Sequence, residues 1–267
     1  MRLRENMDLG LQEKVIIVSG GAAGIGGAIS RACLDEGARV VVLSRRSENV
    51  QEFMDEMAAQ HAPCELIEVH LEDTERARKA VAQVEKKYGS IYGLVNNAGA
   101  NDGVGLESGS VEKFVQSLHG NLVHNYVLAH YALAALKRSQ GAIVNISSKV
   151  ALTGQGGTSG YAASKGGQLA LTREWAAELL PYGVRVNAVL PAEVMTPLYR
   201  RWLDSLGDPA AKLKEITDKI PLGHRMTLAS EIAAATVFLL SPTQSGHTTG
   251  QHWIIDGGYV HLDRALT

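Results

Sequence analysis

Short apolar runs recur along the chain and alternate with longer amphipathic segments. Seven runs rich in β-branched residues occupy positions 14–19, 39–44, 65–69, 91–95, 142–147, 184–189 and 252–256. Their nearly continuous apolar character is typical of strands that are covered on both faces. The segments between them have helical spacing, and several end in glycine. The alternation predicts a single α/β domain over residues 1–267, with a doubly wound parallel sheet of seven strands and helices on both faces.

The longest break in this alternation covers residues 190–228, between the sixth run and the last helix. A long insertion after the carboxyl end of a parallel strand usually covers a ligand, so we interpret this segment as a lid over a substrate site. Residues 1–7 contain two arginines with no apolar stretch behind them. We interpret them as a loose N-terminal extension rather than a secretory signal.

Composition narrows the class of protein. Hydrophobic residues are 45% of the chain, charged residues are 20%, and the formal net charge is −2. These values are typical of a soluble globular domain and predict no nucleic-acid partner and no membrane association. No apolar run has the length of a membrane span. Cys33 and Cys64 lack metal-binding or redox spacing, which indicates free thiols in a reducing compartment, and we expect a cytoplasmic protein.

The first apolar run leads into SGGAAGIGG, where Gly20, Gly24 and Gly26 lie between the strand and a helix that begins near Gly24. Glycines there allow a tight turn and let a pyrophosphate approach the backbone, where the helix N-terminus offers unpaired N–H groups. The motif therefore favours a dinucleotide site. The alternative is a glycine-rich turn that binds nothing.

The end of the second run bears on which dinucleotide is expected. Ser44 occupies the place of the acidic residue that commonly holds the adenosine ribose hydroxyls, and Arg45 and Arg46 follow it. A guanidinium can bind a 2'-phosphate in a bidentate fork, and no carboxylate is present to repel it. We predict NADP, held by Arg45, with NAD as the second choice. The alternative is that both arginines only begin a solvated helix.

A tyrosine and a lysine stand four positions apart in SGYAASKGG, so Tyr161 and Lys165 share one face of a predicted helix. A phenol ordinarily has a pKa of about 10, and an adjacent ammonium lowers that pKa by stabilising the phenolate. The small neighbouring side chains leave room for a substrate carbon. The spacing fits a proton-transferring tyrosine, although a Tyr and a Lys that merely share a helix face are the commoner case.

These motifs follow one order along the chain: SGGAAGIG, NNAG at 96–99, Asn121 in a central helix, Ser148, and YAASK at 161–165. In that order and spacing the chain resembles the short-chain dehydrogenase/reductase family. The resemblance implies a single-domain Rossmann fold, a nicotinamide cofactor, and hydride transfer to or from a carbonyl or alcohol carbon. It also implies a homotetramer.

The resemblance assigns roles to individual residues. Tyr161 would be the general acid/base, and Lys165 would lower its pKa and bind the nicotinamide ribose. Ser148 would hold the substrate oxygen, and Asn121 would anchor a water that relays the proton. The residues expected to contact the cofactor are Gly20, Gly24, Ile25, Gly26, Ser44, Arg45, His70, Leu71, Asn97, Ala98, Gly99, Tyr161, Lys165, Pro191, Val194 and Thr196.

Two positions depart from the family pattern. Where the family usually has an aspartate that bonds the adenine amino group, this chain has His70 followed by Leu71, and we do not take Asp73 as the replacement. The stretch LPAEV replaces a common Pro-Gly, and Glu193 places a carboxylate at the mouth of the site. We therefore expect adenine recognition to differ from the family pattern.

The lid segment mixes aromatic and charged side chains, which suits a sugar better than a steroid or an acyl chain. With PYGVRVN, PLGHRM and the ending DGGYVHLDRAL, the chain also resembles a bacterial branch of the family that oxidises the anomeric carbon of L-fucose-like deoxy sugars to the lactone. That branch in turn resembles a 17β-hydroxysteroid dehydrogenase, so this similarity alone does not separate a sugar from a steroid. The alternatives are a 17β-hydroxysteroid or a 3-oxoacyl thioester as substrate. The residues expected to contact the substrate are Ser148, Gln155, Tyr161, Glu193 and Trp202.

No metal is expected, because the three histidines of the central helix are scattered around its circumference. We interpret them as packing or surface residues: His119, His124 and His130. A more distant alternative is a regulator that binds NADP and turns nothing over. The presence of Ser148, Tyr161 and Lys165 argues against that alternative.

Overall fold

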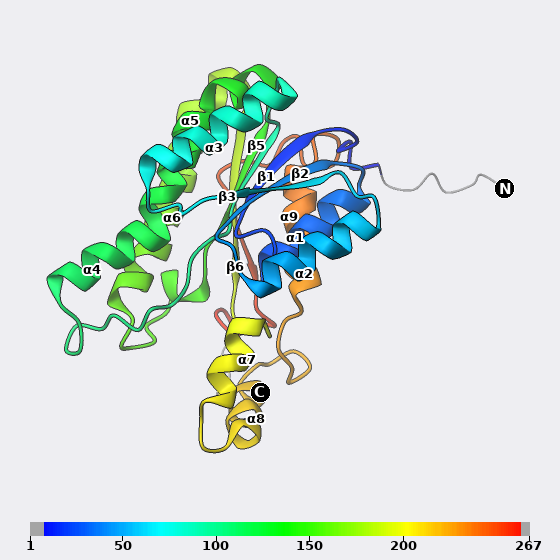
Figure 1. Ribbon diagram of the computed structural model, residues 1–267. Helices are drawn as coiled ribbons and strands as arrows, with labels where there is room; N and C mark the ends of the chain where they lie inside the picture. The colour runs from blue at the N-terminus through cyan, green and yellow to red at the C-terminus, as the bar shows by residue number, and fades with distance from the viewer. Residues whose placement is uncertain (1–7, 263–267) are drawn as a thin grey trace.

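Seven parallel strands form one sheet in the computed structural model, which describes residues 8–262 (Figure 1). The strand order is β3-β2-β1-β4-β5-β6-β7, and every neighbouring pair is parallel. The strands are β1 (Val15–Ser19), β2 (Arg39–Ser44), β3 (Cys64–Glu68), β4 (Gly93–Asn96), β5 (Ala142–Ile146), β6 (Arg185–Pro191) and β7 (His252–Ile255). Each lies within two residues of the run that predicted it, so the doubly wound sheet expected from the sequence is confirmed.

Helices cover both faces of this sheet (Figure 1). Helices α1, α2 and α9 lie on one face, and α3, α5 and α6 on the other. The helices are α1 (Gly24–Asp35), α2 (Glu48–Ala59), α3 (Thr74–Tyr88), α4 (Val111–Leu118), α5 (His124–Ser139), α6 (Ser159–Leu179), α7 (Pro197–Asp204), α8 (Pro209–Asp218) and α9 (Ala229–Leu240). Shorter turns are a π-helix at His119–Val123 and 3₁₀ turns at Lys149–Ala151 and Leu180–Tyr182.

The central strands are mostly apolar because both of their faces are buried. In β1, Ile16 and Val18 join the cluster under α1 and α9, whereas Val15 and Ile17 join the cluster under α3 and α5. Successive side chains of a strand point to opposite faces, so a strand with two buried faces has few polar positions. The nearly continuous apolar runs of the sequence therefore reflect a sheet that is covered on both sides.

The predicted lid lies at the carboxyl edge of the sheet. Helices α7 and α8 project beyond the strand ends, between β6 and α9 (Figure 1). The two ends of this insertion are joined by a bridge between Val194 and Thr227, where Thr227 N donates to Glu193 O at 2.9 Å. Leu222 N donates to Gly257 O at 2.9 Å, which ties the insertion to the segment after β7. The prediction for residues 1–7 lies outside the described residues.

Candidate active site

The glycine-rich loop after β1 has the geometry of an anion cradle. Gly20 and Gly24 have φ values of +63° and +54°, which a residue with a side chain rarely adopts. A Cβ at Gly26 would lie 2.2 Å from the carbonyl oxygen of Gly20. The N-cap residue of α1, Ala23, offers no side-chain cap, and the first turn holds no acidic residue. The first N–H groups of α1 therefore remain available for a phosphate.

A second loop, after β4, is fixed against the glycine-rich loop. The hydroxyl of Ser19 accepts hydrogen bonds from the backbone N–H groups of Asn97 at 2.9 Å and Ala98 at 3.0 Å. The side-chain amide of Asn97 donates to Ser19 O at 3.0 Å. A Cβ at Gly99 would lie 2.7 Å from Oδ1 of Asn121, so this loop also touches the π-helix. The Asn97–Gly99 stretch thus lies between the glycine-rich loop and the predicted catalytic residues.

The ends of β2 and β3 lie side by side, because Val69 N donates to Ser44 O at 2.9 Å. Arg45 and His70 are exposed there, and Leu71 is half-buried. Arg46 points instead toward Glu68, with 3.8 Å between Nε and Oε2. The structure therefore leaves Arg45 as the guanidinium available at this strand end, within the described part of the chain.

Asp73, which we did not take as an adenine ligand, lies at the start of α3. The side chain of Asp73 accepts from Arg76 N at 3.0 Å and caps the N-terminus of α3. Its carboxylate is thus used by the helix that follows. His70 and Leu71 are the side chains that the structure offers at the end of β3.

Ser148, Tyr161 and Lys165 meet at the carboxyl end of β5. Ser148 follows β5, and Tyr161 and Lys165 lie one turn apart on α6. Lys165 Nζ lies 5.4 Å from the centre of the Tyr161 ring and donates to Ile146 O at 2.8 Å. The Ser147 hydroxyl donates to Lys165 O at 2.9 Å, which holds α6 against the strand end. The predicted grouping of a hydroxyl, a phenol and an ammonium is present.

Burial is the largest influence on the pKa values of Tyr161 and Lys165. It raises the pKa of Tyr161 to about 12, and a hydrogen bond with Ser148 opposes that rise. Burial also lowers the pKa of Lys165 to about 7. From the sequence, we expected the Lys165 ammonium to lower the pKa of the Tyr161 phenol. In the structure the desolvation of the phenol is larger, and the opposing effect comes from Ser148.

Asn121 lies in a π-helical turn that separates α4 from α5. Its Oδ1 accepts from Ala100 N at 2.8 Å, and its Nδ2 donates to Ser117 O at 3.1 Å. The side chain is therefore committed to the loop after β4, and the backbone carbonyl faces Gln168, whose Nε2 lies at 3.5 Å. A π-turn is frequent at functional sites, because it displaces one carbonyl from the helical ladder.

The segment after β6 leads into α7 and packs against the glycine-rich loop. Pro191 and Val194 are buried, and Thr196 caps α7 by accepting from Tyr199 N at 3.1 Å. A Cβ at Gly24 would lie 3.2 Å from Cγ2 of Thr196, so this threonine packs on the glycine-rich loop. Ile25, in the first turn of α1, is half-buried and packs against the neighbouring apolar cluster.

Glu193 is not a free carboxylate at the mouth of the site. It forms an ion pair with Lys149, and its Oε2 accepts from the hydroxyl of Tyr199 at 2.8 Å. The Lys149 and Glu193 side chains are 10% and 15% exposed. Lys149 Nζ also lies 4.2 Å from the ring centre of Tyr259. We call these four residues the lid-base cluster, because they join the turn after Ser148 to α7 and to the C-terminal segment.

Gln155 and Trp202 are more exposed than the other predicted substrate residues. Gln155 is exposed on the loop between the Lys149 turn and α6. Trp202 is 44% exposed on α7 and meets the Tyr199 ring edge-on at 5.2 Å between centres. Among residues 8–262, no hydrogen bond or ring contact joins either side chain to Tyr161 or Ser148, so their assignment to substrate stays a prediction.

Sequence reasoning missed the role of Lys149, Gln168 and Ser19. Lys149 follows Ser148 directly, but its partner Glu193 is 44 residues away, and no spacing rule links them. Gln168 had a detectable signal, since a polar residue three positions after Lys165 shares its helix face. The histidines agree with their interpretation, because His119 and His130 are exposed and His124 is buried.

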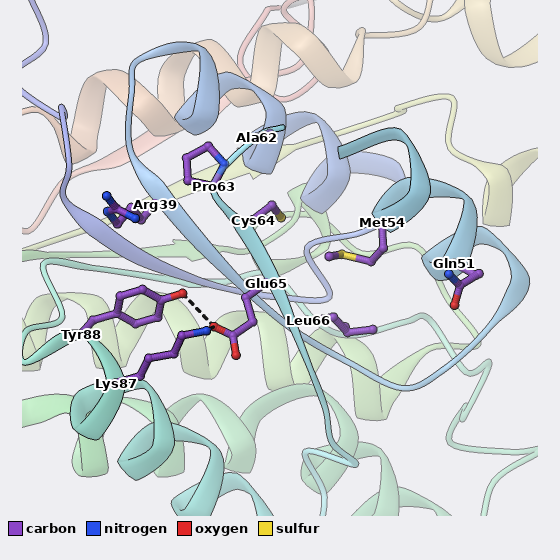
Figure 2. A pocket seen from close by; sticks show the side chains of 10 residues that line it. All are labelled: Arg39, Gln51, Met54, Ala62, Pro63, Cys64, Glu65, Leu66, Lys87 and Tyr88. Carbon is purple, nitrogen blue, oxygen red and sulfur yellow. Dashed lines mark hydrogen bonds and ion pairs between the residues drawn. The ribbon is translucent and has the colours of Figure 1, made fainter. Parts of the chain in front are cut away.

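A surface depression at the sheet edge is distinct from this group of residues (Figure 2). It lies beside the amino ends of β2 and β3, whereas the predicted catalytic residues lie at carboxyl ends. Glu65 in this depression accepts from both Lys87 Nζ and the Tyr88 hydroxyl at 2.7 Å, and Arg39 pairs with Glu13. Among residues 8–262, no helix could cross a membrane and no group of three potential ligands could hold a metal ion.

Comparison with known proteins agrees with this architecture. A family model described as enoyl-(acyl carrier protein) reductase matches residues 20–260. The L-fucose dehydrogenase of Bos taurus is 37% identical over 246 residues, which cover 92% of this chain and 88% of that protein. The Cj0485 dehydrogenase structure has a TM-score of 0.92 and 45% identity, covering 98% of this chain and 99% of that chain. The ligand-free aldohexose dehydrogenase of Thermoplasma acidophilum has a TM-score of 0.86 and 31% identity, with coverages of 97% and 98%.

Proposed function

Because this chain belongs to the short-chain dehydrogenase/reductase family of oxidoreductases, we propose that it is an NADP-dependent dehydrogenase of an L-fucose-like sugar. The reaction removes a hydride from the anomeric carbon and a proton from its hydroxyl, and it yields the lactone. The grouping of Ser148, Tyr161 and Lys165 beside the glycine-rich loop is the observation that carries the proposal.

The residues present fit a dinucleotide. The cradle around Gly26 leaves no room for a side chain, and the N–H groups at the start of α1 suit a pyrophosphate. Arg45 would hold the 2'-phosphate, the Asn97–Gly99 loop would pack on the nicotinamide half, and Thr196 would hold the carboxamide. When bound, the cofactor supplies the acceptor for the hydride.

The protein's own residues manage the proton. Tyr161 as phenolate takes the hydroxyl proton of the sugar, and Ser148 donates to the oxygen that becomes the carbonyl. Lys165 favours the phenolate because an ammonium nearby stabilises the anion. Because Lys165 Nζ lies 5.4 Å from the Tyr161 ring centre, we expect the two groups to titrate as an interacting pair.

Two observations support a sugar as substrate. The related Bos taurus protein is an L-fucose dehydrogenase, and the Thermoplasma protein is an aldohexose dehydrogenase. In addition, the predicted lid carries Trp202, which is 44% exposed, among charged side chains. Polar groups with an aromatic face suit a polyol better than a steroid. An acyl thioester is the second candidate, favoured by the description of the matching family model.

An initial-rate scan tests the substrate. NADP and NAD are each combined with L-fucose, D-arabinose, L-galactose, L-rhamnose, a 17β-hydroxysteroid and a 3-hydroxyacyl thioester, and reduced nicotinamide is followed by absorbance. We expect turnover of L-fucose-like sugars, with the lactone or its hydrolysed acid identified by NMR. Tyr161→Phe is the control, because it should abolish turnover and leave NADPH binding intact. A signal confined to the steroid or the thioester would refute the sugar.

A second experiment tests the cofactor. In Ser44→Asp with Arg45→Ala, a carboxylate replaces the phosphate-binding group, and the ratio of kcat/KM for NADP to that for NAD should fall about tenfold or more. Arg46→Ala is the matched control, because this neighbouring arginine faces Glu68. If Arg46→Ala changes the ratio as much as the double variant does, the phosphate is held elsewhere.

The tetramer expected from the resemblance also remains a proposal. Helix α5 exposes Tyr126 by 53% and Tyr131 by 37%, and α4 exposes Val111 by 75%. Apolar exposure of this extent on neighbouring helices suits a subunit interface. Light scattering of the purified protein measures the mass directly.

A further inference from the structure

Gln168 is a completely buried amide on the inner face of α6, three positions beyond Lys165. Its Oε1 accepts from Lys165 Nζ at 3.3 Å. Its Nε2 donates to the backbone carbonyl of Asn121 at 3.5 Å. Glutamine is rarely buried completely, because an unpaired amide is costly in an apolar interior. Here the two ends of one amide connect the two elements that carry the predicted proton path.

The position of Gln168 is fixed from behind by a second set of buried polar groups. The hydroxyl of Thr172 donates to Gln168 O at 2.7 Å, and Nδ2 of Asn145 donates to that hydroxyl at 2.9 Å. Asn145 lies in β5, next to the strand end that holds Ser148. The chain of contacts therefore runs from the sheet through α6 to the ammonium, and all of its members are buried.

The surroundings of Lys165 give this amide its importance. Nζ donates to Ile146 O and to Gln168, and both acceptors are neutral. Within residues 8–262, no carboxylate forms an ion pair with Lys165. The titratable groups that face it are Tyr161, on the same helix, and His124, on α5. Burial and the ammonium lower the pKa of His124 to about 4, so the imidazole is neutral near pH 7.

We propose that Gln168 is a positioning residue whose amide holds the Lys165 ammonium and links it to the carbonyl of Asn121. Since no described carboxylate pairs with this ammonium, the two neutral oxygens to which it donates determine where it lies. The proposal rests on the proposed roles of Tyr161 and Lys165, but on no particular substrate.

Substitutions of Gln168 should change how strongly Lys165 holds its proton, and the direction depends on the new side chain. Gln168→Met keeps the length of the side chain and removes the acceptor oxygen, so the ammonium form loses a partner. Gln168→Glu supplies a carboxylate at the same place, so the ammonium form gains a partner. An opposite charge nearby, or a hydrogen bond to a charged group, is worth about one pH unit or more.

The first test is the pH profile of kcat for oxidation, with whichever substrate the scan identifies. The acid limb reports the first proton that leaves the Tyr161–Lys165 pair. It should move up by about one pH unit in Gln168→Glu. In Gln168→Met it should move down, and kcat should fall about tenfold, because a smaller fraction of the pair holds the ammonium and phenolate together. Gln116→Glu, an exposed position on α4, is the matched control.

The second test needs no substrate. The free energy of unfolding in urea is measured against pH for the full chain. Because the folded pKa of Lys165 is about 7 and its ordinary value is 10.5, folding gains stability as pH rises between these values. Gln168→Glu should reduce this gain, and Gln168→Met should extend it below pH 7. Failure on every sugar would leave this measurement unaffected.

Wild-type pH dependence in both variants, in kinetics and in unfolding, would overturn the proposal and leave Gln168 as a residue that fills the core. A loss of stability that is equal at every pH would have the same meaning. If Gln168→Met does not fold, the Gln168→Glu profile decides alone, since it predicts a shift in one direction only.

Discussion

Two buried lysines at the carboxyl edge of the sheet have opposite surroundings. Lys149 is 8% exposed and forms an ion pair with Glu193, beneath the ring of Tyr259. Lys165 is 3% exposed, and its Nζ donates to the neutral oxygens of Ile146 and Gln168. The two residues are separated by one 3₁₀ turn, a loop and the first turns of α6.

This difference in surroundings gives two lysines of the same region different roles. Burying a charge is costly unless a partner of opposite charge accompanies it. Lys149 has that partner, and the pair joins the segment after Ser148 to the lid. Lys165 lacks one, and burial leaves its pKa at about 7, where its charge can change during a reaction. We therefore expect loss of Lys149 to harm stability first and loss of Lys165 to harm catalysis first.

The largest expected effect separates the two lysines by activity. Lys165→Met should lower kcat by about 10²–10⁴, the range that general acid–base catalysis supplies, because the phenolate loses its stabilising charge. It should not lower the free energy of unfolding, since it removes an uncompensated buried charge. Steady-state rates and urea unfolding at pH 7 check both statements. A Lys165→Met protein that unfolds readily would break the comparison.

The next effect concerns the lid-base cluster. Lys149→Met leaves Glu193 with Tyr199 alone, and should lower the free energy of unfolding by about 3 kcal/mol, the lower part of the range for breaking a buried pair. Lys149→Met with Glu193→Met removes both charges and should recover most of that loss. Glu56→Gln is the control, because the Arg31–Glu56 pair is half exposed and should have little effect. A double variant no better than Lys149→Met would contradict this account.

The smallest expected effect, per pH unit, is a rise in the free energy of unfolding with pH. Below pH 7 the folded protein carries the full cost of the charged Lys165, and this cost is relieved as pH rises toward 10.5. The free energy of unfolding of the wild type, compared with Lys165→Met, should therefore rise with pH by at most about 1.4 kcal/mol per unit. Measurements from pH 7 to pH 9.5 avoid the ionisation of exposed tyrosines. A difference that falls with pH would have the wrong sign.

The sheet could be predicted almost completely, because burial on two faces leaves a simple pattern. The grouping of Tyr161 and Lys165 could be predicted as well, since both lie on one helix with a fixed period. The π-turn at Asn121 could not, because its residues are compatible with an ordinary helix. The Lys149–Glu193 pair joins segments after two different strands, and only the sheet order brings them together. The predicted direction of the shift in the Tyr161 pKa was wrong, because the sequence shows a nearby ammonium but not how far the phenol is desolvated.

The bridge between Val194 and Thr227 has a consequence for how this chain can vary. It closes the insertion at its base, so the intervening residues form a loop whose ends stay together whatever its length. The entropy of closing such a loop grows only slowly as residues are added. Insertions, deletions and whole exchanges of α7 and α8 should therefore be tolerated, while the strands below keep their register.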